Sequence, residues 1–207
     1  MIAGKSSFIG KGSSSCVFKP SIPCKSKRKN KKKNKNKNKT KAKAKVSKVM
    51  VNSNKKNIRK ELTMNNIIGK IPNHKEWAYI WTEHCKSPTY EIMKEISEID
   101  KCLAEKKLTK QHFKNISMFH GEYGGPKLIN YCLKLIKKNT FEKKTLFIEA
   151  FNKCFKLLDS VFKGIVELGE NKISHQDLSY GNIIINNNKS FIIDFGISCK
   201  FTDLKNI

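Results

Sequence analysis

The chain has 207 residues, of which 38% are hydrophobic, and a formal net charge of +26 from 43 basic and 17 acidic residues. Its length permits one sizeable core or two small lobes that share a cleft. No apolar run approaches the length of a membrane span, and the N-terminus lacks the apolar core of a signal peptide, so an intracellular protein without membrane contact is expected.

The first predicted elements are two strands around a glycine turn within residues 6–19. Phe8 and Ile9 precede the turn, and the apolar run 16–18 follows it. Short apolar runs on either side of Gly and Ser residues are typical of a β-hairpin.

A basic tract between Lys25 and Lys45 follows, in which Lys alternates with Asn, Thr and Ala. Residues 1–60 hold 21 Lys and Arg and no Asp or Glu, so most of the charge excess lies in this part of the chain. Such a tract cannot bury apolar surface and repels itself, which predicts a disordered loop. It is either a weak, salt-sensitive tether to nucleic acid or another polyanion, or a low-complexity insertion from an AT-rich coding sequence.

A valine-rich run over 46–51 predicts the next strand, and residues 55–68 predict a helix that ends at Gly69. Residues 91–107 could form a further helix, and 116–119 a short strand.

The strongest helical periodicity in the chain runs from about Thr145 to Leu168. Apolar residues recur there at spacings of three and four, which predicts one amphipathic helix whose phenylalanine-rich stripe faces the core. Gly169 is the expected C-terminal cap. The stripe consists of Phe147, Phe151, Cys154, Phe155, Leu158, Val161, Phe162 and Ile165.

Two isoleucine-rich runs near the C-terminus, separated by an asparagine-rich turn, predict a second hairpin. If Asn188 lies at the turn centre, Ile183 pairs with Ile193 and Asn182 lies opposite Asp194, with Cα atoms about 5 Å apart. Amide and carboxylate oxygens are ligands that Mg²⁺ accepts alongside phosphate oxygens. The hairpin end is therefore a predicted magnesium site.

The pattern HxDxxxxN over residues 175–182, followed by DFG from Asp194, resembles the catalytic loop and metal-binding segment of protein kinases. Taken singly, these residues could be a core histidine, a helix cap or a turn, but their joint spacing favours catalysis. The resemblance implies ATP and Mg²⁺ as cofactors. It assigns the catalytic base to Asp177, magnesium binding to Asn182 and Asp194, and support of the loop to His175.

Residues 10–18, GKGSSSCVF, resemble the kinase glycine-rich loop GxGxxGxV, with Ser15 where the third glycine is usual. Glycines in such a loop let backbone amides approach phosphate oxygens closely. The resemblance implies nucleotide contacts from Gly10, Lys11, Gly12, Ser13, Ser14, Ser15 and Val17.

Lys48 resembles the strand lysine of the kinase V-A-I-K motif, with Val46 where alanine is usual. The resemblance implies that Lys48 positions the ATP phosphates and that Val46 lines the adenine pocket. In that family the lysine pairs with a glutamate on the next helix. Glu61, the first acidic residue of the chain, lies on the predicted helix 55–68 and is the implied partner.

The glycine-rich break at 121–126 resembles the kinase hinge, which implies adenine contacts from Glu122 and Tyr123. The implied fold is an α+β, two-lobed kinase-like fold. Residues 1–122 would form an N-lobe with an antiparallel sheet and one helix. Residues 123–207 would form an abbreviated, mainly helical C-lobe with the catalytic hairpin.

Only eleven residues follow Gly196, whereas typical protein kinases continue with an activation segment, an APE motif and peptide-binding helices. The chain is therefore expected to be a fragment, a degenerate relative or a minimal kinase. Ser179 also stands where serine/threonine kinases often place a lysine near the transferred phosphate.

The function implied is transfer of the γ-phosphate of ATP to Ser or Thr of a protein substrate, and the sequence is most similar in style to serine/threonine kinases of large DNA viruses. One alternative is a small-molecule or atypical kinase, similar to RIO kinases or aminoglycoside phosphotransferases. Another is a pseudokinase or nucleotide-binding scaffold, tethered to nucleic acid by residues 25–45.

The seven cysteines are scattered, and no pair has CxxC spacing. This distribution predicts neither a zinc site nor a disulfide framework, and it favours isolated thiols in a reducing compartment. The cysteines are Cys16, Cys24, Cys85, Cys102, Cys132, Cys154 and Cys199.

Overall fold

The computed structural model describes residues 6–12, 15–24, 44–50, 55–86, 93–94, 96, 102, 116–138 and 144–206. The chain forms two compact units, one from Met1–Asn54 with Trp81–Tyr123 and the other from Lys55–Ile80 with Gly124–Ile207. In this division residues 55–80 group with the C-terminal part, whereas the lobes predicted from sequence divide the chain once, near residue 122. The predicted basic loop, between residues 25 and 45, lies almost wholly outside the described residues, as does most of the possible helix at 91–107.

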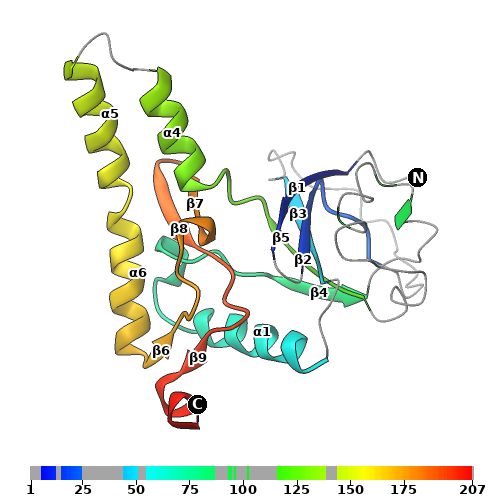
Figure 1. The fold of residues 1–207 in the computed structure, drawn as a ribbon. Coiled ribbons are helices and arrows are strands. Elements are labelled where there is room, and N and C mark those ends of the chain that lie inside the picture. The colour runs from blue at the N-terminus through cyan, green and yellow to red at the C-terminus, as the bar shows by residue number, and fades with distance from the viewer. Residues whose placement is uncertain are drawn as a thin grey trace, which may run out of the picture. The chain divides into compact units, whose positions relative to one another are not determined.

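The first unit is built on a five-stranded antiparallel sheet in the order β1-β2-β3-β5-β4 (Figure 1). The sheet confirms the α+β class with an antiparallel sheet, the hairpin predicted within 6–19 and the valine-rich strand. A register shift between Phe8 and Gly10 lets Gly10 pair with Val17. The strands are β1 (Ser7–Lys11), β2 (Ser15–Lys19), β3 (Lys45–Met50), β4 (Glu83–Lys86) and β5 (Ser117–Glu122).

Strands β2, β3 and β5 are mostly buried and contribute to the core of this unit, in which Phe18, Val49 and Met118 are fully buried. The side chain of Ser47 supports the segment after β2, because its Oγ accepts a hydrogen bond of 2.8 Å from the backbone N–H of Ile22. Burying Phe18 alone removes enough apolar surface to stabilise the sheet by roughly 2–3 kcal/mol.

Two disulfides tie together segments of the first unit that lie far apart in sequence. They join Cys16 to Cys102 and Cys24 to Cys85, with Cα–Cα separations of 6.2 Å and 5.9 Å. The prediction of isolated thiols is therefore wrong for these four residues. The paired residues are 86 and 61 positions apart in the sequence, and short-range cysteine spacing does not report such distant pairs.

The second unit contains four helices among the described residues and two small antiparallel ribbons, β6 with β9 and β7 with β8 (Figure 1). No described helix is long and apolar enough to cross a membrane. The helices are α1 (Lys55–Ile68), α4 (Leu128–Lys138), α5 (Lys144–Lys156) and α6 (Asp159–Glu170). The strands are β6 (Ile173–Ser174), β7 (Ile183–Asn186), β8 (Lys189–Ile192) and β9 (Cys199–Lys200), and short 3₁₀ segments span His74–Glu76, Tyr180–Asn182 and Phe201–Asn206.

The core of this unit forms where α6 packs on the β7–β8 hairpin around Trp77. The backbone N–H of Ile192 donates to the Trp77 carbonyl at 2.8 Å, and the N–H of Tyr79 donates back to the Ile192 carbonyl at 2.9 Å. Helix α6 approaches closely at Gly164, where an added Cβ would lie 2.8 Å from Cε3 of Trp77. The predicted hairpin thus becomes an internal layer beneath a helix.

The predicted single helix over 145–168 is interrupted at Leu157 and Leu158, and α5 and α6 follow each other nearly in line (Figure 1). The prediction that its stripe forms core is wrong for most members. Val161 is the one member of the eight that is buried, and Ala150 and Leu157, which lie outside the stripe, are buried as well. Phe147, Phe151, Phe155, Phe162 and Ile165 are 40%, 53%, 59%, 54% and 41% exposed.

Helix α6 also runs past its predicted cap. Gly169 lies inside the helix, and the residue with left-handed backbone is Lys172, with φ of 55°. The helix end is completed by Asn171, whose N–H reaches the carbonyls of Glu167 and Gly169. Left-handed backbone at a non-glycine residue replaces the expected glycine cap.

Candidate active site

The β7–β8 hairpin closes with a two-residue turn, Asn187-Asn188. Both residues have left-handed backbone, with φ of 49° and 57°, as a type I′ turn requires. The strands therefore pair Ile183 with Ile192, one residue away from the predicted register. The predicted pairing of Asn182 with Asp194 is therefore wrong. That prediction assumed a turn of three residues, whereas the turn has two.

Asn182 instead lies opposite Ile193, whose N–H donates to the Asn182 carbonyl at 3.0 Å. Asp194 is the next residue, and its φ of 64° takes the chain out of strand geometry. Left-handed backbone at a non-glycine residue costs about 1–3 kcal/mol and is concentrated at functional sites. The structure therefore places Asp194 at the same hairpin end as Asn182, one residue beyond the backbone partner of Asn182.

Two carboxylates flank Gly196 within the second unit. An added Cβ on this glycine would lie 3.3 Å from Oδ1 of Asp194 and 3.2 Å from Oε2 of Glu61. Glu61 is 2% exposed on α1, so its carboxylate is held in the interior rather than on the helix surface. A side chain at 196 would crowd both carboxylates, which explains the need for glycine at this position.

The loop between β6 and β7 holds Asp177 through Asn182. The Asn182 side-chain amide, Nδ2, donates to the Asp177 carbonyl at 2.9 Å and to its carboxylate Oδ2 at 2.8 Å. Both amide protons are thereby used on Asp177, which leaves Oδ1 of Asn182 as the group that can accept a cation. The loop therefore brings Asp177 and Asn182 together, and the Asn182 amide orients the Asp177 carboxylate.

His175 connects this loop to the segment at 194–196. The backbone N–H of Asp177 donates to Nδ1 of His175 at 3.3 Å, so Nε2 carries the proton and donates to the Ile193 carbonyl at 3.0 Å. The imidazole also lies against the ring of Phe195, with centroids 5.0 Å apart. A neutral, buried histidine therefore joins the loop that begins at Asp177 to the segment at 194–196.

Burial lowers the pKa of His175, although the Ile193 carbonyl and the carboxylates of Asp194 and Asp177 act in the opposite direction. In the unfolded chain a histidine titrates near 6.5, so on acidification the unfolded state takes up the proton first. The contribution of His175 to stability is therefore present above about pH 6.5 and is lost as the pH falls below it. We expect the urea midpoint to drop between pH 7.5 and pH 5.5, and to drop less in His175→Gln. An equal drop in both proteins would contradict this assignment.

The predicted nucleotide-binding residues lie at the β1–β2 turn of the first unit. The N–H of Gly12 donates to the Ser15 carbonyl at 2.8 Å, which closes the turn, and Ser15 itself is buried. Gly10 pairs with Val17 in the strands that flank it. Ser13 and Ser14 lie outside the described residues, and Lys11 is described only as the last residue of β1.

Lys48 and Val46 are both 4% exposed in β3, and Lys48 pairs with Val17 of β2. A lysine with so little exposure is rare unless a partner or ligand uses its charge. Lys48 belongs to the first unit and Glu61 to the second, so their pairing stays a prediction. Its burial therefore distinguishes Lys48 from the exposed lysines of the chain.

The predicted hinge residues, Glu122 and Tyr123, end β5 and follow it. The N–H of Tyr123 donates to the Ala44 carbonyl at 2.7 Å, which continues the β3–β5 pairing beyond the strand. The ammonium group of Lys19 lies over the Tyr123 ring, 3.6 Å from its centroid. Glu122 is exposed, whereas Tyr123 is half-buried.

Lys127 is a cation beside the loop at 177–182 that sequence reasoning missed. Its Nζ lies 3.8 Å from the position of a Cβ on Gly181, and the Oγ of Ser179 lies 3.4 Å from the same position. An isolated antiparallel bridge to Ile184 brings Lys127 there. The sequence carried no signal for this contact, because the two residues are joined by long-range pairing.

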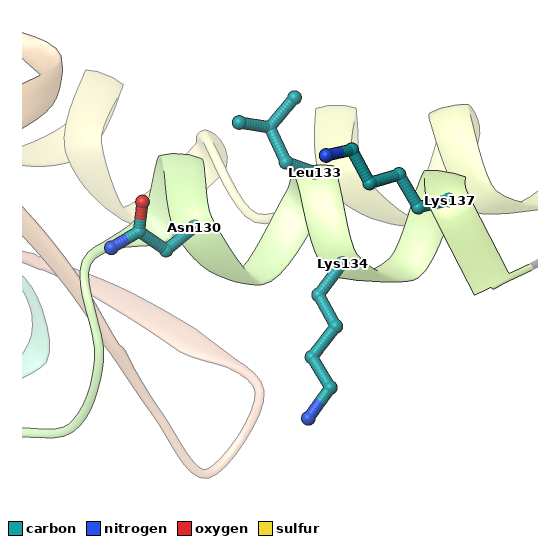
Figure 2. A pocket seen from close by; sticks show the side chains of 4 residues that line it. All are labelled: Asn130, Leu133, Lys134 and Lys137. Atoms are coloured by element: carbon teal, nitrogen blue, oxygen red, sulfur yellow. The ribbon is translucent and has the colours of Figure 1, made fainter.

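An open hollow of about 570 Å³ lies along α4. Figure 2 shows the side chains that line it, which are Asn130, Leu133, Lys134 and Lys137. None of these residues is among the predicted catalytic or metal-binding residues. All four residues lie on a single helix, α4, and two of them are lysines. The hollow therefore adds nothing to the catalytic assignment.

No model of a known protein family matches this sequence, and no curated protein matches it either. A function for the chain must therefore be argued from its own residues and their geometry.

Proposed function

We propose that the chain is an ATP- and Mg²⁺-dependent phosphotransferase with a two-lobed, kinase-like fold, which transfers the γ-phosphate to Ser or Thr of a protein substrate. The supporting observation is the loop in which Asn182 holds the Asp177 carboxylate while His175 fastens the loop to the segment at 194–196. Phosphoryl transfer depends mainly on positioning and electrostatics, so a fixed carboxylate is the part the protein must supply.

The donor atoms at the hairpin end fit a magnesium ion. Oδ1 of Asn182 is directed away from its hydrogen-bonded partner, and Asp194 supplies a carboxylate one residue beyond the strand pair. Hard oxygen ligands of this kind, with phosphate oxygens and water, are those that Mg²⁺ accepts. Bound there, the ion would neutralise charge on the ATP phosphates.

Asp177 is assigned the proton-accepting role. Its Oδ2 is engaged by Asn182, and the residue is exposed, so its other carboxylate oxygen can receive a hydrogen bond from a substrate hydroxyl. A carboxylate oriented in this way aligns the hydroxyl and accepts its proton as the phosphoryl group transfers. The first unit carries the residues proposed for phosphate binding, Lys48 and the glycines of the β1–β2 turn.

The direct test is phosphoryl transfer from γ-labelled ATP to a generic basic protein, with hydroxylated small molecules assayed in parallel. We expect label in the protein, and a loss of about 10²–10⁴-fold in Asp177→Asn, because the hydroxyl is no longer deprotonated. Asp159→Asn, an exposed aspartate on α6, is the matched control and should keep full activity. Undiminished activity in Asp177→Asn would refute the catalytic assignment, and label only in small molecules would replace the substrate class.

Lys127 is proposed to supply the positive charge that Ser179 does not. Its ammonium group lies beside Gly181, within the same loop as Asp177. Lys127→Ala is expected to lower kcat about tenfold or more with KM for ATP little changed, because an electrostatic contact made mainly in the transition state acts on kcat. Lys127→Arg should restore part of the rate, and Lys172→Ala, an exposed lysine in the same unit, should behave as wild type. A rise in KM alone would reassign Lys127 to nucleotide binding.

A further inference from the structure

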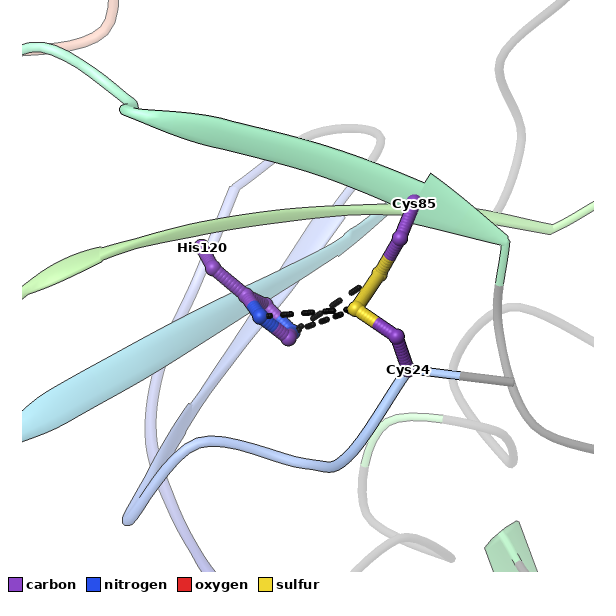
Figure 3. Close-up of side chains that lie close together, drawn as sticks. All are labelled: Cys24, Cys85 and His120. Atoms are coloured by element: carbon purple, nitrogen blue, oxygen red, sulfur yellow. Dashed lines mark hydrogen bonds between the residues drawn. A yellow bond between two sulfur atoms is a disulfide. The ribbon is translucent and has the colours of Figure 1, made fainter. Parts of the chain in front are cut away.

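Three potential metal ligands converge in the first unit. Cys24 follows β2, Cys85 lies on β4 and His120 lies on β5, and their ligand atoms all fall within 4.8 Å of one another. Figure 3 shows the two sulfur atoms joined in a disulfide, with the imidazole turned toward them. Strand register creates this cluster, since β4 and β5 are neighbours.

The distances suit a single small ion. Nε2 of His120 lies 4.0 Å from the Sγ atoms of both Cys24 and Cys85. In a tetrahedral zinc site with bonds of about 2.0–2.3 Å, sulfur and nitrogen ligands are about 3.5 Å apart. Both nitrogen–sulfur edges of the ligand triangle are therefore about 0.5 Å longer than the tetrahedral value, and the sulfur–sulfur edge must open, so the side chains have to shift slightly to seat the ion.

A carboxylate lies beside the histidine of this cluster. Oε2 of Glu83 lies 3.9 Å from Nδ1 of His120, while Oε1 of the same carboxylate accepts a hydrogen bond of 3.1 Å from Lys45. His120 is only 6% exposed, so its ring is held in the interior facing the sulfurs and Glu83. Two sulfurs and one imidazole supply three of the four ligands of a tetrahedral zinc site, and the exposed Glu83 carboxylate supplies the fourth once its side chain turns toward the sulfurs.

The second disulfide of the chain provides an internal contrast. Cys16 and Cys102 are 0% and 2% exposed in the apolar core of the same unit. Cys24 and Cys85 are half-buried, and so are open to reductants, and they have an imidazole and a carboxylate beside them. A bond that serves cross-linking alone needs neither of these groups.

We propose that Cys24, Cys85, His120 and Glu83 form a redox-controlled zinc site. A dithiol reductant gives two electrons and two protons to the Cys24–Cys85 disulfide, which becomes two thiols, while the reductant becomes a disulfide. Zn²⁺ then binds both sulfurs as thiolates and releases their two protons to solvent. Oxidation by a disulfide-containing oxidant reverses the sequence and expels the ion.

The test uses the full chain, reduced with a dithiol that is then removed under anaerobic conditions, and titrated with Co²⁺. We expect one Co²⁺ per chain, with a thiolate-to-metal charge-transfer band and tetrahedral d–d bands, and displacement of the ion by Zn²⁺. The oxidised chain should show neither band. Cys24→Ser should lose the site. The double variant Cys16→Ser/Cys102→Ser, which removes the other disulfide of the same unit, is the control and should keep it.

Glu83→Gln provides a second measurement that does not depend on the sulfurs, since Glu83 is exposed and its loss should not unfold the chain. This variant should keep the charge-transfer band, because both thiolates remain, and should change the d–d bands and weaken binding at least tenfold. If the reduced chain binds no more Co²⁺ than Cys24→Ser, the site is a disulfide only. If binding disappears equally in the Cys16/Cys102 variant, the ion belongs elsewhere, and either result overturns the proposal.

Discussion

Replacement of Asp194 by asparagine is expected to reduce phosphoryl transfer by about 10²–10³-fold or more while leaving the fold intact. Asparagine keeps the size of the side chain and is among the residues that best tolerate the left-handed backbone, here with φ of 64°. The change therefore removes the negative charge proposed to bind magnesium and little else. Initial rates with labelled ATP, measured over a range of Mg²⁺ concentrations, are the readout.

The control for this experiment is Asp203→Asn. Asp203 is exposed, and its carboxylate accepts a hydrogen bond of 3.3 Å from the backbone N–H of Lys200, so the variant should alter local structure near the C-terminus and not activity. The melting temperatures of both variants should lie close to that of wild type. Activity within threefold of wild type in Asp194→Asn would remove the metal assignment, and with it the proposed enzyme.

The largest expected effect on stability is that of Gly125→Ala. Gly125 has φ of 99°, and a Cβ there would collide with the backbone carbonyl oxygen of Ile185, on β7. The strained backbone costs about 1–2 kcal/mol and the displacement of a packed strand about 1–3 kcal/mol more, so a loss of about 2–5 kcal/mol is expected. Urea unfolding monitored by tryptophan fluorescence would measure it, because Trp77 is buried in the same unit.

Gly169→Ala is the matched control for that measurement. A Cβ at Gly169 would meet nothing within 4 Å, and the residue lies inside α6. Alanine is the better helix former by about 0.8–1 kcal/mol, so this variant should be neutral or slightly more stable. If the two variants had the same free energy of unfolding, the close contact between Gly125 and the backbone of β7 would not limit the stability of the unit.

Local patterns in the sequence predicted most helices and strands near the site. The hairpin register and the buried face of each helix depend on contacts between distant residues and could not be predicted in this way. The hairpin at 183–193 was predicted from two apolar runs, but its register depended on whether two or three residues form the turn. The left-handed backbone at Asn187 and Asn188 decided the question in favour of two. The phenylalanine periodicity similarly predicted helix but not burial, because a period does not tell which side of a helix has a neighbour.

The same distinction holds for the site. Asp177 and Asn182 were predicted together because five residues separate them, and their hydrogen bond lies within one loop. Lys127 approaches that loop through a bridge to a strand more than fifty residues later in the chain, and no spacing rule reports such a contact. The convergence of His120 with two cysteines escaped prediction for the same physical reason.

Both boundaries of the lysine- and asparagine-rich tract are fastened to one strand. Cys24 is bonded to Cys85 of β4, and Lys45 lies 3.1 Å from Glu83 at the start of the same strand. Closing a loop costs only about 0.6 kcal/mol more each time its length doubles. Residues gained or lost between these two anchors should therefore change the free energy of folding very little. The same insertion or deletion within β3 or β5 would disrupt the strand pairing of the sheet.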